Sequence, residues 1–218
     1  MLFEVLKVGP LEVNCYLVGS PDTRQALVVD PGAEGDRILT RVAQLGLKVE
    51  GIVLTHGHFD HIGAAAAVRK ATGAPVMIHP ADASMLSDPK LNFSHYVGEP
   101  IALDPPEMSL QEEVPVRVGA VVLGVLHTPG HTPGGVCLHV RPPAGSGEDF
   151  LLTGDTLFAG SVGRTDTTGG SWEQLIDSIT RKLVPFAPRT PVQPGHGPAT
   201  TIGDELAYNP FLAGLRRS

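Results

Sequence analysis

The 218-residue sequence contains few cysteines, few aromatic residues and no long apolar run. Its two cysteines, Cys15 and Cys137, are too few for a disulfide-rich secreted scaffold, and we expect both to be small buried side chains. No apolar stretch approaches the roughly 20 residues that a membrane span requires, so we expect no membrane partner. The first residues lack a basic stretch followed by an apolar one, so we expect no secretory signal and a cytoplasmic location.

The sequence also lacks an excess of positive charge. It has 16 Lys and Arg against 23 Asp and Glu, which gives a formal net charge of −7. A nucleic-acid binder normally needs a basic surface to displace counterions from phosphates, so we expect no nucleic-acid partner. A small-molecule substrate is the expected partner, and the oligomeric state stays open. The length suits one domain, 1–218, with a well-buried core.

Apolar patterns alternate between strand and helix spacing in both halves of the chain. Strands are predicted at 25–29, 51–54, 74–79, 121–126, 135–140, 150–152 and 191–193. Helices are predicted at 36–45, 62–71 and 171–184, the last with Trp172 in its apolar stripe. Strands flanked by amphipathic helices, with no linker between the halves, predict two packed sheets with helices outside them.

The main chemical signal is the segment His56-x-His58-x-Asp60-His61. His56 and His58 are two residues apart, so in an extended segment their side chains point the same way and can share a metal. Asp60 and His61 follow where the chain turns into a helix, so they can face a second metal. Four potential ligands within six residues make incidental polar residues an improbable explanation.

Three further residues, His131, Asp155 and His196, each follow an apolar strand and lie in a Gly- or Pro-rich turn. Loops beyond strand ends gather functional residues in folds of this type. Five histidines and two carboxylates without a thiolate suit two ions such as Zn²⁺, Fe²⁺ or Mn²⁺. A carboxylate can bridge two metals, and Asp155 is the natural bridge if Asp60 belongs to the second metal alone. We expect His79, His95, His127, His139 and the loop around Tyr96 to lie outside the site.

With these residues the sequence resembles the metallo-β-lactamase superfamily, from Asp30 to His196. The resemblance implies an αββα sandwich, an α/β fold of two mixed β-sheets with helices on the outer faces. It implies that His56, His58 and His131 bind metal 1, that Asp60, His61 and His196 bind metal 2, and that Asp155 bridges them. It further implies that Asp30 braces the site without binding metal.

Differences between this sequence and particular branches of the superfamily narrow the range of expected substrates. Metallo-β-lactamases use Cys where Asp155 stands and commonly a residue other than His at His61. The segment 153–159 is similar to glyoxalase II. The ending Gly163-Arg164-Thr165-Asp166 matches the compact bacterial glyoxalase II-like branch and is shared with persulfide dioxygenases. Full-length glyoxalase II holds glutathione with a Lys and a Tyr in this loop and with a C-terminal helical domain, which we expect this chain to lack.

The resemblance therefore implies hydrolysis of a thioester such as S-lactoylglutathione by a metal-bound hydroxide. Asp60 is a candidate catalytic residue that accepts a proton as the intermediate collapses. Arg164 and Asp166 are candidate substrate contacts, or else an ion pair that only braces the loop. A mononuclear iron persulfide dioxygenase, with His56, His131 and Asp155 as ligands, is the main alternative. A lactonase and a non-catalytic metal-binding protein are further alternatives.

Overall fold

The first of two facing sheets is built from the N-terminal half of the chain. The computed structural model describes residues 1–217. This sheet has six strands in the order β1-β2-β3-β4-β5-β6. They are β1 (Leu2–Val8), β2 (Val13–Gly19), β3 (Gln25–Val29), β4 (Lys48–Val53), β5 (Val76–Ile78) and β6 (Met108–Ser109). The first two pairings are antiparallel and the rest are parallel, so the sheet is mixed.

The second sheet comes from the C-terminal half and is mixed as well. Its six strands follow the order β14-β13-β10-β9-β8-β7, and only β10 and β13 pair in parallel. The strands are β7 (Val116–Val118), β8 (Val121–His127), β9 (Val136–Arg141), β10 (Phe150–Gly154), β13 (Pro191–Pro194) and β14 (Thr200–Thr201). A small separate hairpin is formed by β11 (Leu157–Phe158) and β12 (Ser161–Val162).

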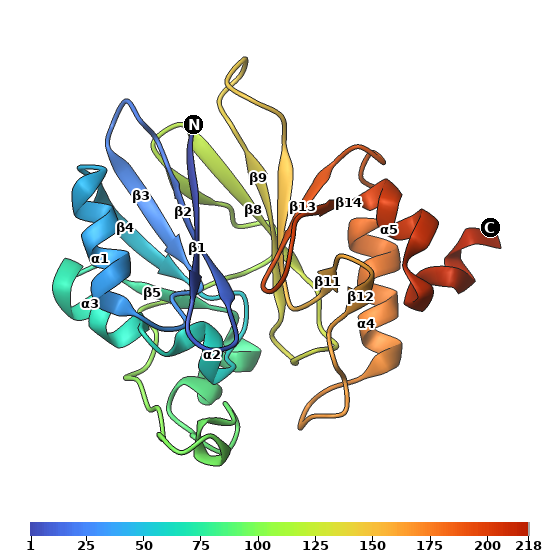
Figure 1. The fold of residues 1–218 in the computed structure, drawn as a ribbon, viewed down its shortest axis with the longest axis horizontal. Coiled ribbons are helices and arrows are strands. Elements are labelled where there is room, and N and C mark those ends of the chain that lie inside the picture. Colours follow the sequence, from blue (N-terminus) through green and yellow to red (C-terminus); the bar gives the residue numbers. More distant parts are fainter. Residues whose placement is uncertain (218) are drawn as a thin grey trace.

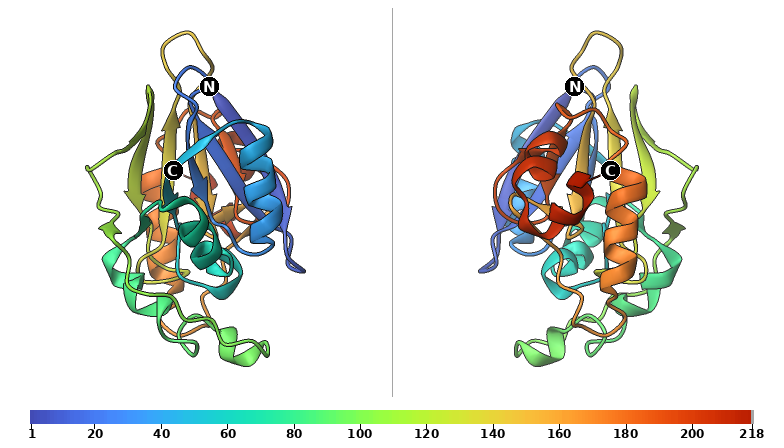
Figure 2. Two further views of the ribbon diagram at one scale, coloured as in Figure 1. Left: turned by 90° about the vertical axis from the view of Figure 1, so that its left-hand side faces the viewer. Right: turned by 90° about the vertical axis from the view of Figure 1, so that its right-hand side faces the viewer.

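Helices cover the outer faces of both sheets (Figure 1). The α-helices are α1 (Gly35–Gln44), α2 (Phe59–Ile62), α3 (Ala65–Thr72), α4 (Trp172–Ser178) and α5 (Ile202–Tyr208). Short 3₁₀ helices are η1 (Pro80–Leu86), η2 (Ser94–Tyr96) and η4 (Pro210–Arg217), and the π-helical turn η3 (Ile179–Leu183) continues α4. Figure 1 shows α1 and α3 outside the first sheet and α4 and α5 outside the second, and Figure 2 shows these two helical faces in turn. The predicted αββα sandwich is confirmed.

Alternating side chains divide the core into three layers. On β2, Cys15 and Leu17 pack toward α1 and α3, whereas Tyr16 and Val18 pack between the sheets. On β10, Leu152 joins that central layer, and the outer cluster packs against α4 and α5. Because successive residues of a strand point to opposite faces, a strand buried on both sides reads as a continuous apolar run. This burial explains why strands such as β3 and β10 were visible in the sequence, although β2 was not predicted.

The structure modifies some sequence expectations. The helix predicted at 62–71 is observed as α3, which begins at Ala65, and Ile62 is the last residue of the short helix α2. The helix predicted at 171–184 begins as expected, with the Ser171 hydroxyl accepting a hydrogen bond from Gln174 N at 3.3 Å. The placement of Trp172 in the core was wrong: its side chain is 48% exposed and contacts the ring of Phe211. Both cysteines are buried and free. None of the helices within residues 1–217 is long and apolar enough to cross a membrane.

Candidate metal centre

The candidate ligands are brought together by the ends of strands. In the first sheet, Asp30 follows β3 and His56 follows the parallel strand β4. In the second sheet, Asp155 follows β10 and His196 follows the parallel strand β13. Parallel strands end at the same edge, so their loops meet beside α2, at the lower edge in Figure 1. His131 reaches this edge from the connection between β8 and β9.

Seven predicted ligands form three overlapping groups whose ligand atoms lie within 4.8 Å of one another. The groups are His56 with His58 and His131, His56 with His61 and Asp155, and Asp60 with His61 and His196. Each group takes residues from loops of both sheets. The first and third groups have the composition that the resemblance implies for metal 1 and metal 2.

The carboxylate of Asp155 lies between these two groups. Its Oδ2 is 3.6 Å from His131 Nε2 and 3.6 Å from His196 Nε2, and its Oδ1 is 3.3 Å from His61 Nε2. Gly195 leaves room for it, because a Cβ at this position would overlap Asp155 Oδ1 and lie 2.8 Å from His61 Cε1. Asp155 therefore has the position that a bridging ligand requires.

Backbone carbonyls fix the orientation of two histidines. The Nδ1 atom of His131 donates to the carbonyl oxygen of Arg164 at 2.8 Å, and that of His196 donates to the carbonyl oxygen of Leu11 at 2.9 Å. A carbonyl can only accept, so Nδ1 of each ring carries a proton and Nε2 is the nitrogen that faces the other candidate ligands. His131 Nε2 lies 2.9 Å from His58 Nδ1, and His196 Nε2 lies 3.2 Å from Asp60 Oδ2. Metal-binding histidines usually have this arrangement, in which the outer nitrogen donates to a fixed acceptor.

Asp30 plays the same part for His61. Its Oδ2 is 3.0 Å from His61 Nδ1, and its two oxygens also accept hydrogen bonds of 2.7 Å from the amide and the hydroxyl of Thr55. The backbone of Asp30 has φ +50°, in the left-handed region that non-glycine residues seldom adopt. Asp30 thus contacts His61 and Thr55 and belongs to none of the three candidate ligand groups.

Several buried atoms of the ligand groups have no hydrogen-bond partner within the described chain. They are His56 Nε2, His58 Nε2 and Asp155 Oδ1. In His58 the other ring nitrogen, Nδ1, is the one that lies 2.9 Å from His131 Nε2. Unsatisfied buried polar atoms cost free energy and are rare in folded proteins. Imidazole and carboxylate groups with open lone pairs are good ligands for Zn²⁺, Fe²⁺ and Mn²⁺, so this donor set fits divalent transition metals.

The two ends of the centre differ in their affinity for protons. Burial and the neighbouring His131 lower the pKa of His58 to about 3. For His61, burial lowers the pKa, but Asp155 and Asp30 outweigh it and hold the pKa well above its ordinary value. For His196, the hydrogen bond to Asp60 likewise outweighs burial and raises the pKa. Without metal, therefore, His61 and His196 hold a proton more readily than His58 does.

A cleft of about 540 Å³ opens onto the centre. It is lined by Leu11, His58, Phe59, Asp60, Phe93, Tyr96, Val97, His131, Asp155, Arg164, Asp166, Thr167 and Thr168. The side chain of Asp60 is 15% exposed, and its Oδ2 lies 3.2 Å from His196 Nε2. Arg164 and Asp166 line the cleft as a bidentate ion pair, with N–O distances of 2.8 and 3.0 Å.

A profile described as the metallo-beta-lactamase superfamily matches residues 8–196 of this chain. The chain belongs to that superfamily. Among curated relatives, "Probable metallo-hydrolase YqgX" of Bacillus subtilis is 39% identical over 99% of both chains. "Hydroxyacylglutathione hydrolase GloC" of Haemophilus influenzae is 35% identical over 97% of this chain and 98% of the relative.

Three solved structures of superfamily members are similar over nearly the whole chain. The BLEG-1 B3 metallo-beta-lactamase has a TM-score of 0.90 and 40% identity, covering 98% of this chain and 100% of the other. TTHA1623 in a di-iron-bound form has a TM-score of 0.81 and 38% identity, covering 96% and 100%. ETHE1 from Myxococcus xanthus has a TM-score of 0.79 and 34% identity, covering 98% and 85%. The family and the curated metallo-hydrolase relatives support a metal-dependent hydrolase, and the names of the three similar structures do not agree on one activity.

Sequence reasoning missed part of the site. The expectation that the loop around Tyr96 lies outside the site was wrong, because Tyr96 and Phe93 line the cleft. The sequence also gave no signal for the carbonyl oxygen of Leu11, since any residue supplies one. His79, His95, His127 and His139 are absent from the ligand groups and from the residues that line the cleft.

Proposed function

We propose that this superfamily member is a binuclear metal-dependent hydrolase that cleaves thioesters of the glyoxalase II type. The observation that carries the proposal is the position of Asp155, between a three-histidine group and a second group of one carboxylate and two histidines. A closed structural site needs four ligands, so seven donors around one cleft favour a two-metal catalytic centre.

In this proposal His56, His58 and His131 hold metal 1, and Asp60, His61 and His196 hold metal 2. Asp155 would be shared by the two ions, which would be Zn²⁺, Fe²⁺ or Mn²⁺. Two such ions would supply a hydroxide nucleophile at neutral pH and would polarise the carbonyl oxygen of the substrate. A seryl or cysteinyl nucleophile is not required.

The chain's own residues position the substrate and move the proton. Asp60 is the candidate catalytic residue, because its carboxylate borders the cleft and can accept a proton as the tetrahedral intermediate collapses. Phe93, Tyr96 and Leu11 give the cleft apolar walls that suit the carbon skeleton of a small thioester. The donated Nδ1 protons of His131 and His196 keep those rings in place during the reaction.

The choice of a thioester is supported by the likeness to the Haemophilus hydrolase and by the segment 153–159. The thiol half of the substrate is held less well than the carbonyl. Arg164 is the only basic side chain among the residues that line the described cleft, and its charge is offset by Asp166. Weak binding of the remote thiol half raises KM and orients the reacting carbon poorly.

The test is steady-state hydrolysis of S-lactoylglutathione by protein whose metal content has been measured. We expect measurable turnover limited mainly by a high KM, in a panel that also contains simple acyl thioesters, lactones and a β-lactam. Tight, saturable turnover would show that another surface grips the thiol carrier. No thioester turnover by the fully loaded protein would refute the thioesterase assignment. Turnover of the β-lactam alone would instead favour the activity named for BLEG-1.

An iron-dependent persulfide dioxygenase is the second candidate, supported by the likeness to ETHE1 and by the shared 163–166 ending. That reaction needs one Fe²⁺ held by two histidines and one aspartate, which His56, His131 and Asp155 can supply. Metal count and oxygen consumption separate the candidates. We expect about two ions per chain and no oxygen uptake with a persulfide. One iron per fully loaded chain, together with oxygen uptake, would establish the dioxygenase.

A further inference from the structure

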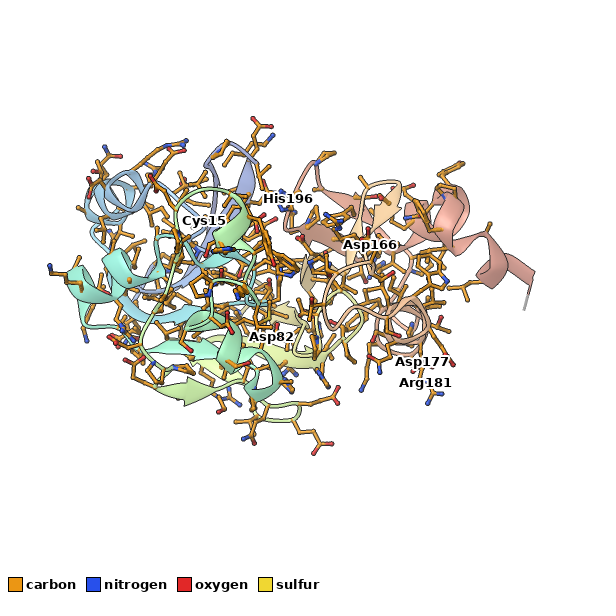
Figure 3. All side chains as sticks on the ribbon, turned by 90° about the horizontal axis from the view of Figure 1, so that it is seen from below. Cys15, Asp82, Asp166, Asp177, Arg181 and His196 are labelled. Atoms are coloured by element: carbon orange, nitrogen blue, oxygen red, sulfur yellow. The ribbon has the colours of Figure 1, made fainter. Side chains whose placement is uncertain are left out.

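Asp82 is a buried carboxylate that none of the three ligand groups contains. It lies on η1, in the segment after β5, and its side chain is fully buried. The start of η1 is fixed, because His79 Nδ1 accepts a hydrogen bond from Ala81 N at 3.3 Å and His79 O accepts one from Asp82 N at 3.0 Å. In Figure 3 Asp82 is labelled near the middle of the molecule, between its two halves.

Its two oxygens join the loops that carry the three-histidine group. Asp82 Oδ2 accepts from the amide of Gly57 at 3.2 Å and from the hydroxyl of Thr132 at 2.7 Å. Asp82 Oδ1 accepts from the amide of Gly134 at 2.6 Å. Gly57 stands between His56 and His58, and Thr132 follows His131. One carboxylate thus connects the backbone beside all three nitrogen ligands.

Two glycines allow η1 to approach both loops. A Cβ at Gly134 would lie 2.6 Å from Asp82 N and 2.7 Å from Asp82 Oδ1. A Cβ at Gly57 would lie 2.6 Å from the Cβ of Met85, also on η1. Real Cβ atoms do not come this close to other heavy atoms, so any larger residue at either position would push η1 and a loop apart. The close packing and the hydrogen bonds therefore act together.

We propose that Asp82 is a positioning residue that sets the separation of the 55–58 and 131–134 loops and thereby the affinity of the three-histidine group for metal 1. The inference rests on the proposed metal centre and adds a residue that binds neither metal nor substrate. The first loop belongs to one sheet and the second to the other. Without a fixed connection between the two loops, the nitrogen atoms of His58 and His131 are no longer held at a fixed distance from each other. Because metal affinity depends on the geometry of the ligands, metal 1 then binds more weakly.

The experiment measures the two metal dissociation constants of the whole chain by titrating Co²⁺ into metal-free protein. Cobalt held by three histidines and cobalt held by two histidines and a carboxylate absorb differently, so the two binding steps are followed separately. In Asp82→Asn an amide NH₂ group replaces one of the two accepting oxygens. This group is a donor and faces another N–H or O–H donor, so at least one of the hydrogen bonds is lost. We expect metal 1 to bind roughly tenfold more weakly, the low end of the loss for partners of metal ligands. We expect the affinity for metal 2 to change little.

Matched variants separate positioning from general damage. Asp30→Asn alters the partner of His61 and should weaken metal 2 more than metal 1. Thr132→Val removes one hydrogen bond to Asp82 and should weaken metal 1 in part, whereas Thr132→Ser keeps the hydroxyl and should restore it. Thermal unfolding of each metal-free variant gives the change in stability. Ranked by this change, the variants should not fall in the same order as when they are ranked by their dissociation constants for metal 1.

Several results would overturn the inference. Equal weakening of both metals by Asp82→Asn, in proportion to the loss of stability, would show a structural role only. So would wild-type affinity for metal 1 in Asp82→Asn, or equal affinities in Thr132→Val and Thr132→Ser. Failure of the proposed function is distinguishable, because the wild type would then bind two ions and hydrolyse no thioester. A wild type that binds no ion at the three-histidine group would overturn both.

Discussion

Arg164→Ala and Asp166→Asn should change the KM for S-lactoylglutathione in opposite directions if the cleft binds its anionic half through Arg164. The guanidinium and the Asp166 carboxylate form two hydrogen bonds at the cleft wall. A substrate carboxylate must compete with Asp166 for the same donors. Removing the cation removes the contact, whereas neutralising Asp166 frees the cation for the substrate.

The magnitude follows from exposure. A charge-assisted hydrogen bond contributes about 1.5–3 kcal/mol, and the Arg164 side chain is 66% exposed, so the lower value applies. About 1.4 kcal/mol corresponds to a tenfold change, so Arg164→Ala should raise KM roughly tenfold. The value of kcat should change little, because the contact is equally present in the ground state and the transition state. Asp166→Asn should lower KM by a smaller factor, since solvent and salt screen the freed charge.

The assay is steady-state kinetics on wild type and both variants at low and high salt, with metal content verified. Neither substitution removes the carbonyl of Arg164 that accepts from His131, so the metal centre should stay loaded. An exposed ion pair adds little stability, so Tm should stay near that of the wild type. An increase of KM in both variants, insensitive to salt, would refute the argument and leave the pair as a brace of its loop.

Three further outcomes test the metal centre. Loss of a residue that supports a metal ligand can cost up to about a hundredfold in activity, so Asp155→Ala, which removes a ligand itself, should cost at least roughly that much. His139→Ala should change activity little. Equal losses in the two variants would contradict the ligand assignment. As pH falls by one unit below neutral, the affinity for metal 2 should drop about tenfold, because the pKa of His61 is raised and metal binding must displace its proton. The affinity for metal 1 should change less, because the pKa of His58 is lowered. Isothermal titration in buffers of different ionisation enthalpy checks this, and equal proton release at both sites would refute it. Gly195→Ala should lower metal content and cost roughly 1–3 kcal/mol of unfolding free energy by overlap with Asp155, whereas unchanged values would show that this loop can move.

Part of the fold was predictable because several of its strands are buried on both faces. Residues 26–29 and 150–152 are apolar throughout, and the turns after them carry Asp30 and Asp155. Strands β1 and β2 were not predicted. Two short segments were less visible. The residues between 62 and 71 favour helix throughout, and the sequence does not reveal the break at Gly63 and Ala64 between α2 and α3. Trp172 has the spacing of a core residue, but no element covers it completely.

The candidate ligands could be chosen from residue type and spacing, whereas their hydrogen-bond partners could not. Histidines and aspartates after strands indicate a metal centre wherever they occur in this pattern. The acceptors for His131 and His196 are backbone carbonyls, which every residue carries, so the sequence cannot mark them. Asp82 lies in a polar segment without a motif, and only the folded chain brings it to Gly57 and Thr132.

Each ligand group takes residues from loops of both sheets, so an ion bound there acts as a cross-link between the two halves of the sandwich. The groups are assembled only in the folded chain, and binding is therefore coupled to folding. A ligand present at a thousand times its dissociation constant adds about 4 kcal/mol to stability, a large part of the 5–15 kcal/mol typical of a whole domain. A chelator should therefore lower the free energy of unfolding as well as the activity, because it removes the cross-link between the two sheets.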